Sequence, residues 1–373
     1  MKQYFNDMIY LCSCAVNNIE PEKSRVEKMD IEKIYTIADY HTLTSITAYT
    51  LEKAGVKDEK FYISKGKAAR KNLLFDIERK KLFSFCEESK IWYMPLKGCI
   101  LKEYYPDFSM RQMADNDILF NDEYQAEIKK YFEGNGYETV SYKKGNHDVY
   151  RKPPVLNFEM HTSLFSNSHD VRWKKYYENI KTRLQKDINN NYGYHFSDED
   201  FYIYIKIHEY KHYSNGGTGI RSLLDSYVFL KEKSSVLNFE YIEKECLKLG
   251  ISDFEKQSRK LSFKVFGENS EDFSENEKNM LERYLFSGTY GTFKNTVHKK
   301  IEDFQKENKN SSELKYILKR VFPPMNFYKE YFPTFYRFKI FIPAIWLYRI
   351  IRSLTVKRKL TVKELEYLRK YNN

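Results

Sequence analysis

Two aspartates, Asp115 and Asp117, stand one residue apart in the stretch RQMADNDILF, directly before the apolar run 118–120. Aspartate is depleted in strands, and residues i and i+2 of a strand point to the same face, so the two Cα atoms would lie roughly 6–7 Å apart. The two negative charges repel unless a positive charge lies between them. Mg²⁺ satisfies this requirement, because it binds one or two carboxylates together with phosphate oxygens. The stretch therefore predicts a strand that begins in a metal site.

A third carboxylate is predicted from the stretch VLNFEMH at 155–161. Alternation along a strand puts Glu159 on a polar face with Asn157 and His161, while the other face is apolar. Glu159 could bind a metal ion and accept a proton from an attacking hydroxyl. Two ions about 3.5–4 Å apart would clamp the attacking and leaving oxygens of a phosphoryl displacement. Asp115, Asp117 and Glu159 are therefore the predicted metal ligands and catalytic residues, with Mg²⁺ or Mn²⁺ as cofactor.

Two further motifs are candidates for binding a triphosphate. Lys97 and Gly98 stand between an apolar strand and a helix-like stretch, where bare backbone N–H groups can approach a phosphate. Arg111 lies four residues before Asp115 and could reach the triphosphate or steady the acidic pair. We expect these three residues to bind nucleotide.

The motif HEYKH at 208–212 matches H-E-x-x-H, which places two histidines on one helix face for zinc with a glutamate as base. Zinc peptidases need a third ligand, and the extended form of the motif fails because Asn215 stands where glycine is required. Asp225 is available as a third ligand. A zinc hydrolase, a structural polar cluster and a nucleotide contact therefore stay open. The nearby NGGTG at 215–219 favours a helix-to-helix turn over a phosphate loop, because no G-K-[ST] follows it.

Hydrophobic periodicity predicts four units along the chain. The ranges 1–88 and 196–300 are helical, 89–195 is mixed α/β with the strand-like runs YETVSY, DVYRK and VLNFEMH, and 301–373 is a basic helical region. We find no internal repeat of the length that builds solenoids. The expected fold class is α+β, with a small mixed sheet flanked by N-terminal and C-terminal helical units.

The net charge of +11 resides in the C-terminal part, since 309–373 holds 15 Lys and Arg against 4 Asp and Glu. Such a region attracts nucleic acid, an anionic membrane or a phosphorylated ligand, or is only a solvated surface. The apolar run 340–348 is too short to span a bilayer, and it predicts either a packing helix or weak association with a membrane surface. Five cysteines without a C-x-x-C pair favour a reducing, cytoplasmic setting.

The stretch PLKGCILKEYYPDFSMRQMADNDILF resembles the signature of the polymerase-β-like nucleotidyltransferases, and specifically the bacterial NTP-transferase family 5. The resemblance extends over about 90–370. It implies a small mixed sheet with Asp115, Asp117 and Glu159 as metal ligands, and a helical unit from which His208, Lys211 and His212 contact nucleotide phosphates or the acceptor. Two positions depart from the usual pattern: Asn116 replaces an apolar residue between the acids, and Cys99 follows Gly98 where serine or glycine is common.

These features together predict a Mg²⁺-dependent nucleotidyltransferase that moves an NMP from an NTP to a hydroxyl or phosphate acceptor and releases pyrophosphate. The alternative is a noncatalytic nucleotide-binding or nucleic-acid-binding module that uses the basic C-terminal region. The acceptor, the base of the NTP and the oligomeric state stay open at this point.

Overall fold

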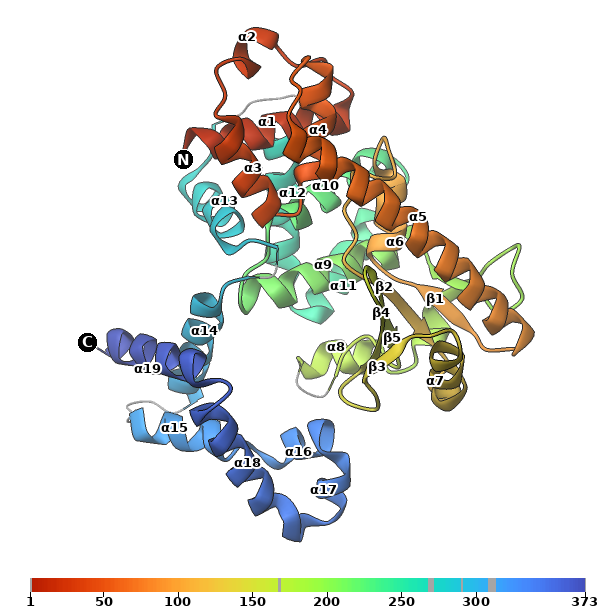
Figure 1. Cartoon of the computed structure of the whole chain (residues 1–373), viewed down its shortest axis with the longest axis vertical. Coiled ribbons are helices and arrows are strands. Elements are labelled where there is room, and N and C mark those ends of the chain that lie inside the picture. Colours follow the sequence, from red (N-terminus) through yellow and green to blue (C-terminus); the bar gives the residue numbers. More distant parts are fainter. Residues whose placement is uncertain (1, 167–168, 268–271, 290, 308–312, 373) are drawn as a thin grey trace.

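The computed structural model of the protein describes residues 2–166, 169–267, 272–289, 291–307 and 313–372 (Figure 1). Five helices come first: α1 (Gln3–Asn17), α2 (Lys23–Val26), α3 (Ile31–Tyr40), α4 (Thr44–Lys53) and α5 (Glu59–Glu88). Asp58 caps the longest of them, because its side chain accepts a hydrogen bond from the Phe61 N–H. At 30 residues, α5 extends about 45 Å and connects the N-terminal helices to the sheet.

A five-stranded mixed sheet follows, with the order β1-β2-β5-β4-β3. Its strands are β1 (Tyr93–Pro95), β2 (Asn116–Phe120), β3 (Glu138–Ser141), β4 (His147–Lys152) and β5 (Leu156–His161). The pair β2 and β5 is parallel, whereas all the other pairs are antiparallel. Every residue of β2 is buried, as expected for a strand inside a sheet that is covered on both faces.

Short elements connect the strands and cover the sheet. The segment between β1 and β2 contains α6 (Gly98–Leu101) and η1 (Lys102–Tyr104), and η2 (Asp122–Tyr124) leads into α7 (Gln125–Gly134). Ile128 and Phe132 of α7 share a buried cluster with Tyr150 and Phe158 of the sheet and with Leu82 of α5. After β5 come α8 (Val171–Tyr176), η3 (Ile180–Arg183), and the two-stranded sheet of β6 (Leu184–Lys186) and β7 (Tyr194–Phe196).

The next helices share a core with the N-terminal ones. They are α9 (Asp198–Ser214), α10 (Ile220–Lys233), α11 (Phe239–Leu249), α12 (Ser252–Phe266) and α13 (Glu275–Ser287). One buried cluster joins α1, α3 and α4 to α10, α12 and α13, and it includes Tyr105 and Met110 from the segment before β2. The residues that lead into β2 are therefore anchored in the helical core.

The last helices form a separate lobe with small cores of their own (Figure 1). They are α14 (Phe293–Glu307), α15 (Glu313–Val321), α16 (Met325–Tyr331), α17 (Pro333–Arg337), η4 (Lys339–Phe341), α18 (Ile342–Leu354) and α19 (Arg358–Asn372). Within the described ranges, none of the helices has the length and the apolar composition that crossing a bilayer requires. The predicted α+β class, with a small mixed sheet between helical units, is confirmed, and the four unit boundaries stay a prediction.

Candidate active site

Asp117 and Glu159 lie opposite each other on the parallel strands β2 and β5. Because paired residues of neighbouring strands project from the same face of a sheet, the two carboxylates share one face. Asp117 is buried, and Glu159 is half-buried at the same edge of the strand pair. Two of the three predicted acids are thus adjacent in space although 42 positions separate them in the chain.

Asp117 is held by two partners on one oxygen. Its Oδ1 atom accepts a hydrogen bond from Nε2 of His161 at 2.8 Å and lies 3.2 Å from Nζ of Lys97. Burial alone would raise the pKa of this carboxyl, but Lys97 and His161 hold the pKa well below its ordinary value. Burial lowers the pKa of His161 to about 4, so its imidazole is neutral at pH 7 and donates through Nε2. Asp117 is therefore a fixed anion.

Asp115 lies just before β2 and is half-buried. Burial, followed by the charges of Asp117 and Glu159, raises the pKa of Asp115 to about 7. Burial and Asp117 also raise the pKa of Glu159. The charges of Asp117 and Glu159 thus oppose the ionisation of Asp115, as expected for carboxylates that lie close together.

Lys97 and Gly98 form a tight turn after β1. Lys97 has a φ of +45°, a backbone conformation that residues other than glycine rarely adopt. Its ammonium group faces Asp117. A side chain at Gly98 would meet Nη1 of Arg111 at 2.6 Å, so glycine is required for the arginine to pack there. The turn thus brings the ammonium group of Lys97 to the acidic residues.

Arg111 is buried against Asp225 of α10. Its Nε and Nη2 atoms donate to the two carboxylate oxygens at 2.7 and 2.9 Å, and the Tyr105 hydroxyl donates to the same carboxylate at 2.8 Å. This bidentate pair fixes the segment before β2 on the helical core. The guanidinium that sequence analysis assigns to the triphosphate is directed at Asp225.

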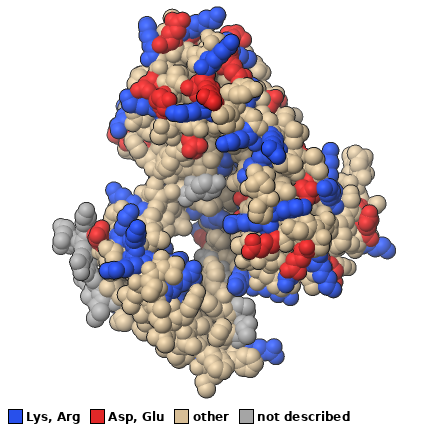
Figure 2. All heavy atoms as spheres, viewed as in Figure 1, with Lys and Arg blue, Asp and Glu red and all other residues tan. Residues whose placement is uncertain are grey.

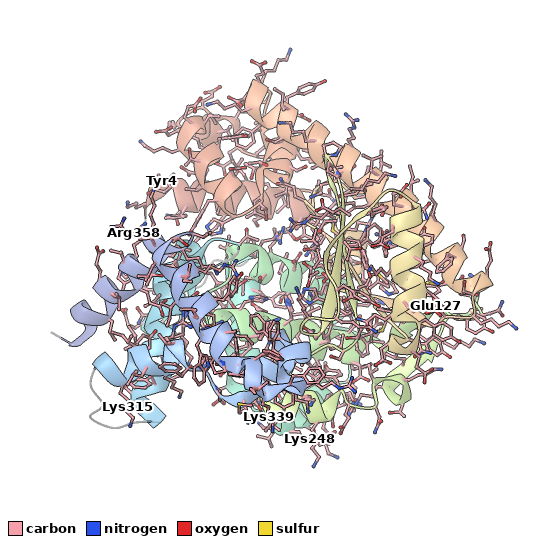
Figure 3. The ribbon with its side chains drawn as sticks, turned by 60° about the horizontal axis from the view of Figure 1, so that its bottom comes forward. Tyr4, Glu127, Lys248, Lys315, Lys339 and Arg358 are labelled. Atoms are coloured by element: carbon pink, nitrogen blue, oxygen red, sulfur yellow. The ribbon has the colours of Figure 1, made fainter. Side chains whose placement is uncertain are left out.

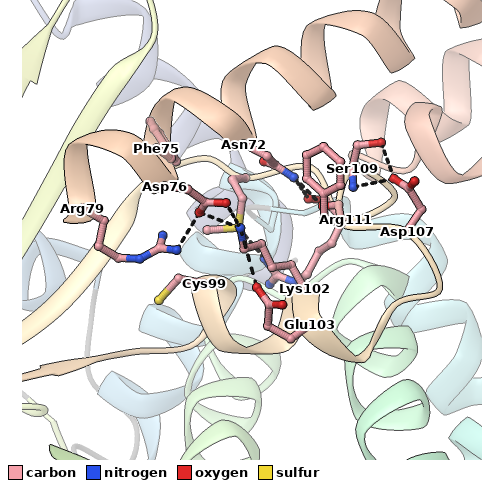
Figure 4. Close-up of polar contacts among 12 residues, drawn as sticks. Asn72, Phe75, Asp76, Arg79, Cys99, Lys102, Glu103, Asp107, Ser109 and Arg111 are labelled. Carbon is pink, nitrogen blue, oxygen red and sulfur yellow. Dashed lines mark hydrogen bonds and ion pairs between the residues drawn. The ribbon is translucent and has the colours of Figure 1, made fainter. Parts of the chain in front are cut away.

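Helix α5 fastens the segment between β1 and β2 from the other side (Figure 4). Nζ of Lys102 donates to both oxygens of Asp76 at 2.6 and 2.5 Å, and the Asn72 amide donates to the Arg111 carbonyl at 3.0 Å. Asn116, the unusual residue between the two acids, accepts a hydrogen bond from Arg79 at 2.9 Å. Asn116 therefore connects β2 to α5.

The C-terminal half of α9 carries a basic group of side chains toward the acids. Acidic residues in its first turn and Lys211 and His212 in its last turn match the helix dipole. Burial and Lys97 lower the pKa of Lys211 to about 8, while Asp117 and Glu159 raise it, which places this ammonium within the field of the site. The Nε2 atoms of His208 and His212 lie 3.3 Å apart. Burial, together with the charges of Lys97 and Lys211, lowers the pKa of His208 and His212, so the three predicted residues of α9 lie within the field of Lys97.

Glu209, the acid of the H-E-x-x-H motif, faces the helical core, where its carboxylate meets Tyr284 of α13 and Ser226 of α10. Its carboxylate accepts from the Tyr284 hydroxyl at 2.6 Å and from Nζ of Lys206 at 2.5 Å, and it is buried. A glutamate that is satisfied in this way cannot act as a base beside a metal held by His208 and His212. This geometry disfavours the zinc hydrolase alternative.

His147 is a functional candidate that sequence analysis does not include. It pairs with His161 across β4 and β5, and its Nε2 atom lies 3.7 Å from Oε2 of Glu159. Within the described ranges, His147, Glu159 and His161 are the set of potential metal ligands whose ligand atoms all lie within 4.8 Å of one another. A sequence-based prediction of His147 would have needed the register of β4 and β5, which places His147 beside His161.

A pocket of about 430 Å³ lies between the N-terminal helices and the segment before β2, and its lining includes Ala114, the neighbour of Asp115 in the chain. Its walls come from α3, α5, α10 and the segment before β2, and they include Lys67, Lys71 and Arg221. Nζ of Lys71 donates to the Ala114 carbonyl at 3.0 Å, and Lys71 interacts electrostatically with Asp115. The pocket therefore reaches the residue before Asp115, and its lining holds three cationic side chains and the carboxylate of Asp39.

A protein family and a solved structure are similar to this chain. The model of a family described as an uncharacterised nucleotidyltransferase matches residues 27–267. The solved structure is the crystal structure of an antigenic nucleotidyltransferase-like protein from Paracoccidioides brasiliensis, with 16% identity and a TM-score of 0.30 over 43% of this chain and 75% of that chain. Among curated proteins, no match was found.

Proposed function

The chain belongs to the nucleotidyltransferase family whose model spans residues 27–267, and from this premise we propose that it moves an NMP from an NTP to a hydroxyl or phosphate acceptor with the help of Mg²⁺ or Mn²⁺. Membership confirms the resemblance predicted from 95–120 and places the protein among the transferases. The metal, the nucleotide and the acceptor are parts of the proposal.

The observation that carries the proposal is the opposition of Asp117 and Glu159 across β2 and β5, with Asp115 beside them. Carboxylates that lie close together repel one another when they are ionised, and a cation between them relieves this repulsion. The donor set fits a divalent ion, because carboxylate oxygens are the ligands that Mg²⁺ and Mn²⁺ prefer. Asp115, Asp117 and Glu159 would hold the ion, which when bound neutralises charge on the phosphate oxygens.

The chain's own side chains do the rest of the work in this proposal. Lys211, His208 and His212 on α9 bind the triphosphate, and the charge of Lys97 keeps Asp117 ionised. Glu159 accepts the proton of the attacking hydroxyl as the new bond between that oxygen and the α-phosphorus forms. The bond between the α-phosphorus and the bridging oxygen breaks, and pyrophosphate leaves with its electron pair. Positioning and electrostatics supply most of the rate, since phosphoryl transfer needs little covalent chemistry from the protein.

We assign Gly98 and Arg111 to positioning. Gly98 leaves room for the guanidinium of Arg111, and the pair of Arg111 with Asp225 holds the segment that leads to Asp115. Neither role requires contact with the nucleotide. Both residues act by keeping the acids of β2 in register with Glu159.

We place the acceptor in the pocket next to Asp115. The pocket is lined by the cations Lys67, Lys71 and Arg221 and by the hydroxyl groups of Thr42, Thr44 and Ser64. These groups suit an acceptor that carries a phosphate or carboxylate beside the hydroxyl to be modified.

Transfer of label tests the proposal directly. The purified protein is incubated with each α-³²P-labelled NTP, with Mg²⁺ or Mn²⁺ and with cell extract. We expect one extract component to acquire the label, while a γ-labelled NTP yields only labelled pyrophosphate. Absence of transfer from every NTP with either metal would contradict the proposal.

The noncatalytic alternative predicts binding of nucleic acid without transfer of label. A nucleic-acid-binding module would bind RNA or DNA with steep salt dependence carried by 309–373, and Asp115→Asn would leave this affinity unchanged.

A further inference from the structure

The C-terminal lobe exposes apolar side chains to an unusual extent. Of the 30 large apolar side chains exposed in the described part of the chain, 13 lie between residues 331 and 363, a segment that makes up less than a tenth of the protein. Such a concentration of exposed apolar side chains is typical of an interaction site, because a surface that faces only water gains nothing from it. The 13 are Tyr331, Phe335, Phe338, Ile340, Phe341, Leu347, Tyr348, Ile350, Ile351, Leu354, Val356, Leu360 and Val362.

Helix α18 has two apolar faces, and only one of them is covered. Ile342 and Ile345 are buried in a cluster with Tyr328 of α16, and the Trp346 indole donates to the Tyr328 hydroxyl at 2.8 Å. This inner face satisfies the packing of the helix within the lobe.

The other face of α18 forms an exposed stripe. Leu347, Ile351 and Leu354 are 61%, 51% and 65% exposed, and their spacing of four and three residues puts them on one side of the helix. Ile340 and Ala344 continue the same spacing toward η4, and Ile340 is 83% exposed. We call Ile340, Ala344, Leu347, Ile351 and Leu354 the outer stripe. No described part of the chain covers it.

Basic residues accompany the outer stripe along the chain. The segment 331–363 contains no Asp or Glu and eight basic residues, namely Arg337, Lys339, Arg349, Arg352, Lys357, Arg358, Lys359 and Lys363. Figure 3 turns this lobe forward, with Lys339 just before α18 and Arg358 beyond its other end. Figure 2 shows the same lobe as a broad uncharged face with lysine and arginine at its edges.

We propose that the outer stripe docks on the surface of an anionic lipid bilayer, with α18 lying in the plane of the interface. An amphipathic helix with aliphatic and aromatic side chains on one side and lysine and arginine around it binds such a surface through apolar burial and attraction to anionic headgroups. At 13 residues α18 is too short to cross the bilayer, so it lies on the membrane. This role is independent of the proposed transfer reaction.

Two other occupants fit the surface less well. A second copy of the chain would bring the same positive segment against itself, because a twofold interface is self-complementary. A nucleic acid would match the charge, but its phosphates would leave Ile340, Leu347 and Ile351 in contact with water. An anionic bilayer satisfies both the charge and the apolar stripe.

Flotation of the full-length protein with vesicles tests the proposal. We expect binding to vesicles of two parts phosphatidylcholine and one part phosphatidylglycerol, and weak binding to phosphatidylcholine alone. The double variant Leu347→Ser/Ile351→Ser should lower vesicle affinity at least about tenfold, because each side chain loses its apolar burial. Lys339→Gln/Arg352→Gln should lower the affinity for the anionic vesicles and make it less dependent on salt.

The matched control is Leu247→Ser, which removes an equally exposed leucine (72%) from α11. Circular dichroism establishes that each variant is folded. Equal affinity of the double variant and the wild type for anionic vesicles would overturn the proposal, as would equal binding to neutral and anionic vesicles. Sedimentation that reveals a dimer dissolved by Leu347→Ser/Ile351→Ser would assign the stripe to self-association. Displacement from vesicles by duplex RNA, together with loss of RNA binding in the double variant, would assign it to nucleic acid.

Discussion

Asp117 on β2 and Glu159 on β5 are register partners in the single parallel strand pair among the described strands of the sheet. Parallel pairing aligns the two strands in direction as well as in face, so both carboxylates sit at the same level along the sheet. A shift of one residue in either strand would send one carboxylate to the apolar side. The relation between these two residues therefore depends on everything that fixes β2 in place.

The first prediction concerns these acids. Glu159→Gln and Asp117→Asn should each lower the rate of NMP transfer by at least about 10²-fold, because each removes a charge that the reaction requires. Transfer of α-labelled phosphate measures the rate, and circular dichroism checks the fold. Asp122→Asn, at an exposed aspartate of η2, is the matched control and should transfer normally. Full activity of Glu159→Gln would remove Glu159 from the mechanism.

The second prediction concerns the metal. His147 adds an imidazole nitrogen beside Glu159, and burial lowers the pKa of His147, so its ring is a neutral ligand at pH 7, whereas Nε2 of His161 already donates to Asp117. Imidazole favours transition metals over Mg²⁺, so we expect Mn²⁺ to bind more tightly than Mg²⁺. Electron paramagnetic resonance of free Mn²⁺ measures the affinity with and without competing Mg²⁺. His147→Phe should weaken Mn²⁺ binding by about 10-fold or more and leave Mg²⁺ binding nearly unchanged. Loss of both affinities to the same extent would contradict a specific role of the imidazole.

The third prediction separates positioning from phosphate binding at Arg111. Arg111→Met leaves the Asp225 carboxylate buried without its partner, and we expect the free energy of unfolding to fall by about 3–5 kcal/mol. Arg111→Met/Asp225→Leu should recover much of this loss, since the unpaired charge is gone. Urea unfolding measures both variants, with Arg70→Met at an exposed position of α5 as control. An unchanged free energy of unfolding in Arg111→Met would contradict the positioning role and favour a contact between Arg111 and the triphosphate.

The fourth prediction concerns acid stability. His41 is fully buried, its Nε2 atom lies 3.1 Å from the Leu285 carbonyl, and burial lowers the pKa of His41 to about 4. The unfolded chain, with an ordinary histidine pKa of about 6.5, takes up this proton first as the pH falls. The free energy of unfolding should therefore fall between pH 6.5 and pH 4, by up to about 3 kcal/mol from this residue. His41→Gln should make the decline shallower, as measured by urea unfolding at pH 7 and pH 4.5. An identical pH dependence in wild type and variant would contradict the assignment.

The fifth prediction concerns the acceptor pocket. Lys71→Ala should lower labelling of the acceptor about tenfold, because an ion pair with an anionic acceptor is lost, and should leave the affinity for NTP unchanged. Calorimetry with a non-hydrolysable NTP measures the second quantity. Lys71→Arg should restore most of the labelling, and Lys80→Ala, at an exposed position of the same helix, is the control. A parallel loss of NTP affinity would place the triphosphate in this pocket.

The alternation of polar and apolar residues was sufficient to predict three strands of the sheet and the polar face that carries Glu159. The runs that predict strands at 137–142, 148–152 and 155–161 correspond to β3, β4 and β5, and alternation places Glu159 on the same polar face as His161. These features depend on neighbours in the chain, which a sequence displays directly. The short strands β6 and β7 carry no comparable periodicity and were not predicted.

Contacts between distant segments could not be predicted in the same way. Nothing near Arg111 in the chain indicates Asp225, which lies 114 positions later, and nothing near His147 indicates that it faces Glu159. Such pairs follow from strand order and helix packing, which depend on the whole fold. The sequence therefore indicated which residues carry charge at the site, but it did not indicate which of them neutralise one another.

Helix α5 has one end in the N-terminal core and the other end under the sheet, and it holds Asn116 and the Lys102 segment on the way. The sheet is consequently not a separable module. A truncated protein that starts at β1 would lose Arg79, which donates to Asn116, and Asp76, whose two carboxylate oxygens accept from Lys102. Attempts to express the strands without the first 90 residues should therefore yield insoluble or unfolded protein.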